Sequence, residues 1–111
     1  MRTIPIHNTL NNVTPGAQIW TGRCAVKSCI HGGDGVNDYE LAVFDCVGVP
    51  AGTEVQVYPI CPYAADAYGL NGSERDGEAD CIVGAYVIAY DIGGGAYSGG
   101  DINVTTDIIV G

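Results

Sequence analysis

Side chains branched at Cβ dominate this sequence, which has 12 Val, 11 Ile and 7 Thr residues against 3 Leu and 1 Met. Branched side chains lose rotamer freedom in a helix and pack well on a pleated sheet. The unbranched residues that fill ordinary helices are scarce. Turn-forming residues, 17 Gly and 5 Pro, separate the apolar segments. The chain is therefore predicted to be all-β, and its 111 residues suit one two-layer domain.

The expected architecture is a small single-domain β-sandwich, immunoglobulin-like or jelly-roll-like. Residues 1–14 are polar, and Pro5 and the following Pro15 deny a helix, so we predict an extended N-terminal arm there and the sandwich domain over 15–111. A turn over Val49–Thr53 that feeds an alternating segment is similar to turns of immunoglobulin-like sandwiches. Strands are predicted at 17–31, 39–49, 54–60, 81–92 and 102–110, with a polar excursion at 62–80 that holds one helical turn over 62–68.

Alternation within 17–31 indicates which side chains face the core. Trp20, Cys24, Val26 and Ile30 share one parity and are predicted to point inward. Cys29 has the opposite parity to Cys24, so these two thiols are expected on opposite faces and not to pair with each other.

Segment 81–92 shows no such alternation, because both of its faces are apolar. A strand apolar on both faces is buried on both, whereas a two-layer sandwich normally leaves one face to water. We therefore expect a cover for the second face, supplied by the N-terminal arm, a loop or another subunit. The predicted interface residues are Ile4, Ile6, Ile82, Tyr86, Ile88 and Tyr90.

The five cysteines leave three interpretations open. In an oxidising compartment they would form disulfides and leave one thiol over. Otherwise they are small buried hydrophobes. Metal binding is the weakest interpretation, because the intervals of 4, 16, 14 and 19 residues between them lack the tight pairs of a zinc site. The candidate disulfide or thiol residues are Cys24, Cys29, Cys46, Cys61 and Cys81.

Four acidic residues alternate in the segment 74–80. If this segment is extended, their carboxylates share a face and repel, and a hard cation such as Ca²⁺ would relieve the repulsion. The alternative is a solvated acidic loop. No other cofactor is expected, although the loop at 34–40 is a second position for an ion. The candidate Ca²⁺ ligands are Glu74, Asp76, Glu78 and Asp80.

The charge balance and the motifs exclude several functions. With 13 acidic and 4 basic residues the net charge is -9, which argues against nucleic acid and anionic membranes as partners. No segment approaches the roughly 20 apolar residues of a membrane-spanning helix. The only histidines are His7 and His31, and no nucleophile, phosphate-loop or zinc-protease motif occurs. The protein is therefore expected not to be an enzyme.

These features favour a structural protein that binds and stabilises a larger assembly. A phage capsid decoration or cement protein on the virion surface suits an acidic sandwich with apolar area left to cover. Its partners would be the major capsid protein, further copies of itself in a homo-oligomer, or both. Residues 1–12 lack the apolar core of a secretory signal, which fits synthesis in a cytoplasm. The alternative is an extracellular carbohydrate-binding or adhesive module, with or without Ca²⁺, or a fibre- or pilus-like subunit.

Overall fold

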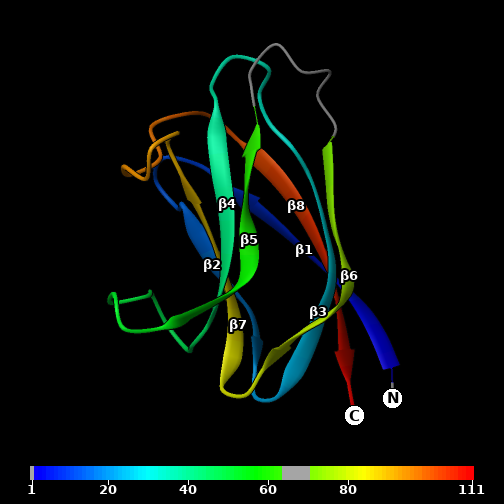
Figure 1. The fold of residues 1–111 in the computed structure, drawn as a ribbon. Coiled ribbons are helices and arrows are strands. Elements are labelled where there is room, and N and C mark those ends of the chain that lie inside the picture. The colour runs from blue at the N-terminus through cyan, green and yellow to red at the C-terminus, as the bar shows by residue number, and fades with distance from the viewer. Residues whose placement is uncertain (1, 64–70) are drawn as a thin grey trace.

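Eight strands build the described part of the chain, and they form two four-stranded antiparallel sheets that face each other (Figure 1). The computed structural model describes residues 2–63 and 71–111, and the side chains of 2–57 and 79–111. Sheet A has the order β1-β8-β3-β6, and sheet B has the order β2-β7-β4-β5. The all-β prediction is confirmed. The strands are β1 (Arg2–Leu10), β2 (Gly16–Thr21), β3 (Cys24–Gly32), β4 (Tyr39–Asp45), β5 (Val55–Tyr63), β6 (Asn71–Cys81), β7 (Gly84–Tyr90) and β8 (Ile102–Val110).

The strands pair according to their distance from the middle of the chain. β1 pairs with β8, β2 with β7, β3 with β6 and β4 with β5, as in one long hairpin with its tip at the β4–β5 loop. Two further pairings, β3 with β8 and β4 with β7, join these ribbons into the two sheets. The ends of the chain therefore lie side by side, with Arg2 opposite Val110 (Figure 1).

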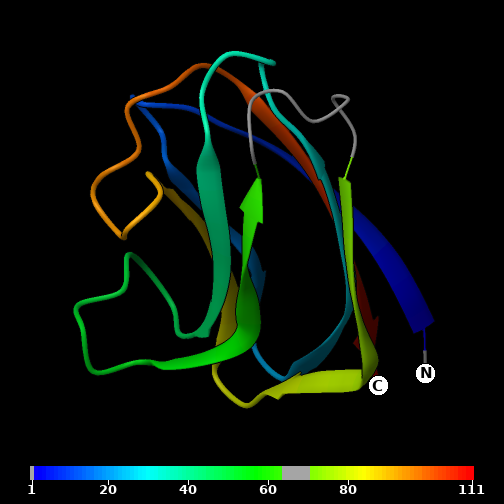
Figure 2. The same ribbon diagram turned by 45° about the horizontal axis from the view of Figure 1, so that its top comes forward.

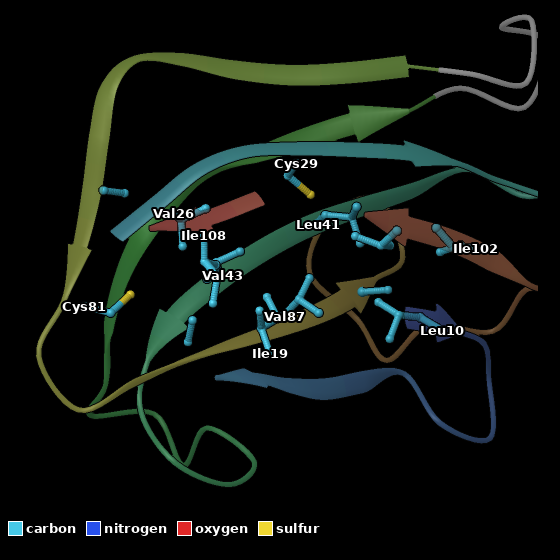
Figure 3. Close-up of a cluster of buried hydrophobic side chains, with 14 of the residues drawn as sticks. Leu10, Ile19, Val26, Cys29, Leu41, Val43, Cys81, Val87, Ile102 and Ile108 are labelled. Carbon is cyan, nitrogen blue, oxygen red and sulfur yellow. The ribbon is translucent and has the colours of Figure 1, made fainter. Parts of the chain in front are cut away.

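The core lies between the sheets and takes side chains from both (Figure 3), and along β1 and β8 the more buried residues alternate with more exposed ones. β8 shows the pattern most clearly, because every second residue from Ile102 to Val110 is buried. Such alternation is what a strand with one solvated face requires. Among the described residues, no helix is long and apolar enough to cross a membrane.

Residues 2–10, expected as an arm, form the edge strand β1. Each of these nine residues has a partner in β8. Ile4 and Ile6 are half-buried and pack against the core cluster. Pro5 fits this position because an edge strand has one side without ladder hydrogen bonds. The predicted boundary at residue 14 falls in the loop between β1 and β2.

The segment 17–31, predicted as one strand, is two strands in different sheets. The chain turns at Gly22, whose φ of 105° favours glycine. The register of β3 then shifts between Val26 and Ser28. Such a bulge reverses the alternation, so Cys29 is buried and Ile30 is 47% exposed. The inward prediction for Ile30 is wrong, and Cys24 and Cys29 both face the core.

The prediction of a long polar loop over 62–80 is also wrong in part. Residues 71–81 form β6, an edge strand of sheet A, where charged residues are common because they discourage further pairing. Pro62 and Tyr63 end β5, and the rest of the predicted helical turn lies outside the described residues. Strand β7 begins only at Gly84, because Ile82 and Val83 form the turn after β6.

Candidate functional site

One end of the sandwich displays a group of aliphatic side chains. Among the described residues, nine large hydrophobic side chains are exposed, and five of them lie at this end. The other four are spread over three loops of the opposite end and the outer face of β3. We call the five the aliphatic end. They are Val47 and Val49 in the β4–β5 loop, Val55 at the start of β5, and Ile82 and Val83 in the β6–β7 turn, at 55%, 71%, 65%, 66% and 52% exposure.

Gln18 joins three segments behind the aliphatic end. Its Nε2 lies 2.9 Å from the carbonyl oxygen of Trp20, 3.0 Å from that of Cys46 and 2.9 Å from that of Ala85. Its Oε1 accepts a hydrogen bond from the Gly48 amide at 2.8 Å. One half-buried side chain thereby ties β2, the β4–β5 loop and β7 together.

Two carboxylates hold the same loops from the solvent side. Asp45 accepts hydrogen bonds from the amides of Ile82, Val83 and Gly84 at 2.9, 2.8 and 3.2 Å. Burial raises the pKa of Asp45, but these three donors outweigh it and leave the pKa below its ordinary value. Glu54 likewise accepts from three consecutive amides, those of residues 51–53, which lowers its pKa. Both loops are thus shaped by internal hydrogen bonds, and their aliphatic side chains point to solvent.

Asp34 organises the opposite end of the sandwich. It accepts hydrogen bonds from the amides of Val36 and Asn37 and, across to the β7–β8 loop, from the amide of Gly100 at 3.0 Å. The bonds from Asn37 and Val36 lower the pKa of Asp34 to about 2. The loop at 34–40, a candidate position for an ion, therefore has its first carboxylate already engaged by the protein's own amides.

The pKa of Asp34 predicts an acid-dependent stability. Because the folded pKa lies below the ordinary value of 3.8, the carboxylate stabilises the fold above about pH 4, and this contribution is lost as the pH falls towards 2. We expect the melting temperature of Asp34→Asn to lie below that of the wild type at pH 5 and to converge with it near pH 2. Asp80→Asn, at an exposed site on β6, is the control. A gap of equal size at pH 5 and pH 2 would contradict the assignment.

Three aromatic rings extend the core towards this same end. The rings of His31 and Tyr39 meet edge to face, with Nδ1 of His31 2.7 Å from the Tyr39 hydroxyl. Tyr39 in turn meets Tyr97 edge to face, and the hydroxyl of Tyr97 donates to the carbonyl of Gly100. Burial lowers the pKa of His31 and raises that of Tyr97 to about 12. Both groups are therefore neutral at pH 7, as suits packing residues.

A shallow pocket of about 230 Å³ lies on the outer face of sheet A, around Gly32. Gly32 and Gly33 line it together with His31. His7, Asn103 and Thr105 supply polar walls, and Ile30 supplies an aliphatic one. His7 Nδ1 lies 2.9 Å from the Thr105 hydroxyl, which fixes the imidazole at the rim.

The predicted metal residues are placed only in part. Glu74, Asp76 and Glu78 belong to β6, and their side chains lie outside the described residues. Asp80 is exposed. Within the described part of the chain, no group of three or more His, Cys, Asp or Glu residues could hold a metal ion.

The cysteines and the predicted interface residues are placed more fully. Cys24, Cys46 and Cys81 are buried free thiols, and Cys29 is also buried, while the side chain of Cys61 lies outside the described residues. Of the predicted interface residues on 81–92, Ile82 is exposed, Ile88 and Tyr90 are half-buried, and Tyr86 is 8% exposed. The ring of Tyr86 lies over Gly16, where a Cβ would come within 2.7 Å of it. The chain itself therefore covers part of the second apolar face of β7.

Comparison with protein-family models, curated proteins and solved structures finds no match for this chain.

Sequence reasoning missed the residues that build the aliphatic end, apart from Ile82. Gln18 and Asp45 are polar residues within strand patterns, and nothing in their spacing indicates that they bind distant loops. A signal was present for Val47 and Val49, which flank Gly48 just before Pro50 and so lie in a turn, where aliphatic residues are unusual.

Proposed function

We propose that this protein is a non-enzymatic structural protein that binds a larger protein assembly through its aliphatic end. The observation that carries the proposal is the exposure of five aliphatic side chains on two neighbouring loops and the adjoining start of β5, where Gln18 and Asp45 hold the loops in place. Exposed apolar groups rimmed by polar ones are typical of protein–protein contact sites. Loops that are already ordered lose little conformational entropy when they dock.

The strand order supports a jelly roll, one of the two fold types that the sequence leaves open. A jelly roll has eight strands in two sheets with Greek-key connections. An immunoglobulin constant domain has seven strands distributed differently. Jelly rolls occur in viral capsid and lectin domains. This analogy is at the level of fold. It favours the virion form of the proposal, a capsid decoration or cement protein on the virion surface.

The net charge of -9 favours a partner whose contact surface is neutral or basic. Two copies brought together through their aliphatic ends would repel each other, whereas a neutral or basic surface with an apolar centre would be complementary. The major capsid protein is therefore the proposed occupant of the aliphatic end. A homo-oligomer, the other predicted association, would use another face of the sandwich.

Rebinding to native particles tests this proposal. Particles are purified from the native source on a density gradient, and each fraction is probed with an antibody against this chain. Particles stripped of the chain are then incubated with recombinant protein. We expect the wild type to rebind and the double variant Ile82→Ser/Val83→Ser to rebind at least 10-fold more weakly, since burying each aliphatic side chain at a contact contributes on the order of 1 kcal/mol.

Val36→Ser is the matched control, because Val36 is 75% exposed on a loop at the opposite end. This variant is expected to rebind like the wild type. The proposal is overturned if the chain is found only in fractions of free protein, or if the double variant and the control rebind equally well. Dimerisation of the purified wild type that the double variant abolishes would instead assign the aliphatic end to a second copy.

The pocket around Gly32 favours a second candidate, a carbohydrate-binding module. An imidazole, a carboxamide and a hydroxyl beside an aliphatic wall are groups that sugar hydroxyls and C–H faces can use. We expect a glycan array to give hits that His7→Ala loses and Val36→Ser keeps. An array without hits, together with calorimetry that detects no Ca²⁺ binding, counts against this candidate and against its Ca²⁺-dependent form. Electron microscopy of the native source separates both candidates from a fibre subunit.

A further inference from the structure

Two of the buried cysteines lie directly opposite each other in sheet A. Cys24 at the start of β3 pairs with Cys81 at the end of β6. Both side chains belong to the core cluster, with 6% and 0% exposure. Figure 3 shows the Cys81 side chain directed into the space between the sheets. Burial raises the pKa of both thiols, and each thiol also acts on the pKa of the other, as neighbouring groups do.

This register meets the backbone requirement of a disulfide. Opposed residues of an antiparallel pair have Cα atoms about 4.5 to 5.5 Å apart, and disulfides span Cα distances of about 4.4 to 6.8 Å. The side chains also share a face, which a cross-strand bond requires. The geometry points to Cys24 and Cys81 as a cross-strand disulfide site, which closes when the chain folds in the presence of a disulfide oxidant.

No other described strand pairing offers two cysteines. Cys29 lies opposite Ser73 on one side and Thr106 on the other. Cys61 lies opposite Leu41. Cys46 lies in a loop, where its thiol donates to the carbonyl of Gly48 at 3.5 Å. Among directly opposed residues of the described strands, Cys24 and Cys81 are therefore the only cysteine pair.

A bond at this site would fix the end of β6 that has the fewest residue pairs with β3. Val26 lies opposite Ala79, but Ser28 lies opposite Glu74, so the ladder is interrupted on the β6 side. Beyond the interruption, β6 and β3 share only three residue pairs, and β6 bends here (Figure 2). The β6–β7 turn follows Cys81 at once, so the bond would anchor Ile82 and Val83 from behind.

The chemistry is thiol–disulfide exchange with a small-molecule disulfide such as oxidised glutathione. One cysteine thiolate attacks the oxidant, forms a mixed disulfide and releases one glutathione thiol. The second cysteine thiolate then attacks the mixed disulfide, closes the Cys24–Cys81 bond and releases the second glutathione thiol. The two cysteine protons pass to the two released thiols through solvent. Burial raises the pKa of Cys24 and, more strongly, that of Cys81, to about 12. The folded thiols therefore react slowly, and the bond is expected to form during folding.

Trypsin distinguishes this pair from the alternatives because the chain has few basic residues. Cleavage after Arg23, Lys27 and Arg75 places Cys24 in peptide 24–27 and Cys81 in peptide 76–111. The other three cysteines all fall in peptide 28–75. The protein is refolded in reduced and oxidised glutathione, free thiols are alkylated at low pH, and the digest is analysed by mass spectrometry without reduction.

We expect peptide 24–27 to be joined to peptide 76–111, with a mass about 2 Da below the sum of the two reduced peptides plus any alkylation elsewhere. The refolded oxidised protein should melt on the order of 10 °C above its reduced form, because the bond closes a long loop. Cys81→Ala should lose both the linked peptides and the difference in melting temperature. Cys46→Ala, another buried cysteine, should keep both.

Recovery of peptide 24–27 with an alkylated thiol from the refolded wild type would overturn the inference. So would its linkage to peptide 28–75. Both outcomes are read from the wild type, so they do not depend on the stability of a variant. They are also independent of particle binding, so this inference can fail while the proposed function stands.

Discussion

Replacing Gly84 with alanine is expected to destabilise the fold by about 3 kcal/mol, the upper part of the range for overpacking. A Cβ at this position would lie 2.7 Å from the carbonyl oxygen of Trp20 and 3.0 Å from that of Cys46. Both atoms are backbone, so they can move only if β2 or the β4–β5 loop moves. The same Cβ would lie 3.2 Å from Nε2 of Gln18, the side chain that joins those segments.

Gly95→Ala is the matched control for this prediction. A Cβ at Gly95 meets nothing within 4 Å, and its backbone does not need the conformation that favours glycine. The expected change in the free energy of unfolding is within about 0.5 kcal/mol, with either sign. Urea unfolding of both variants measures the difference. Equal midpoints for Gly84→Ala and Gly95→Ala would show that the strands around Gly84 give way easily, contrary to the packing described.

Gln18→Ala is expected to cost about 3 kcal/mol, because the two N–H groups shared among three carbonyl oxygens and the one accepting oxygen amount to three hydrogen bonds of about 1 kcal/mol each. The Gly48 amide loses its acceptor, so its hydrogen exchange should accelerate by more than the loss of global stability accounts for. Exchange measured residue by residue by NMR tests this. Thr21→Ala, at an exposed neighbour on β2, is the control and should change neither quantity appreciably.

Gln18→Glu separates the hydrogen bonds from the volume of the side chain. Glutamate keeps an acceptor for the Gly48 amide but, when ionised, faces three carbonyl oxygens without a proton to donate. A protonated glutamic acid regains one donor. The variant should therefore be less stable relative to the wild type at pH 7 than at pH 4. A difference that does not depend on pH would assign the role of Gln18 to packing alone.

The fold class was predictable because it depends on composition and on alternation, which are local. β8 alternates from Ile102 to Val110 as expected, since it has one face on the core and one on solvent. The prediction for 17–31 failed because one extra residue in β3 reverses which side chains face the core. No local signal marks a bulge of this kind. The prediction of a loop at 71–81 failed because polar residues on an edge strand have the composition of a loop when the neighbouring strand is unknown.

The candidate site was predictable only where it coincides with unusual local sequence. Ile82 was singled out because it belongs to an apolar segment, although for the wrong reason, since it lies in a turn and not on the face of a strand. Gln18 and Asp45 act on residues 28 to 67 positions away in the chain. Such contacts exist only once the sheets are stacked. For the same reason, the opposition of Cys24 and Cys81 could not be read from their spacing.

The nested pairing of the strands sets an order in which the chain can assemble. Among the strands that the structure describes, only β4 and β5 are consecutive and paired, so this hairpin closes the shortest loop and has the lowest entropic cost. Each outer pair closes a longer loop, up to β1 with β8, which joins the two ends of the chain. Folds dominated by such distant contacts fold slowly. During synthesis on a ribosome, β1 emerges first but has no partner in sheet A until β8 has followed, so the first strand made is among the last to be fixed.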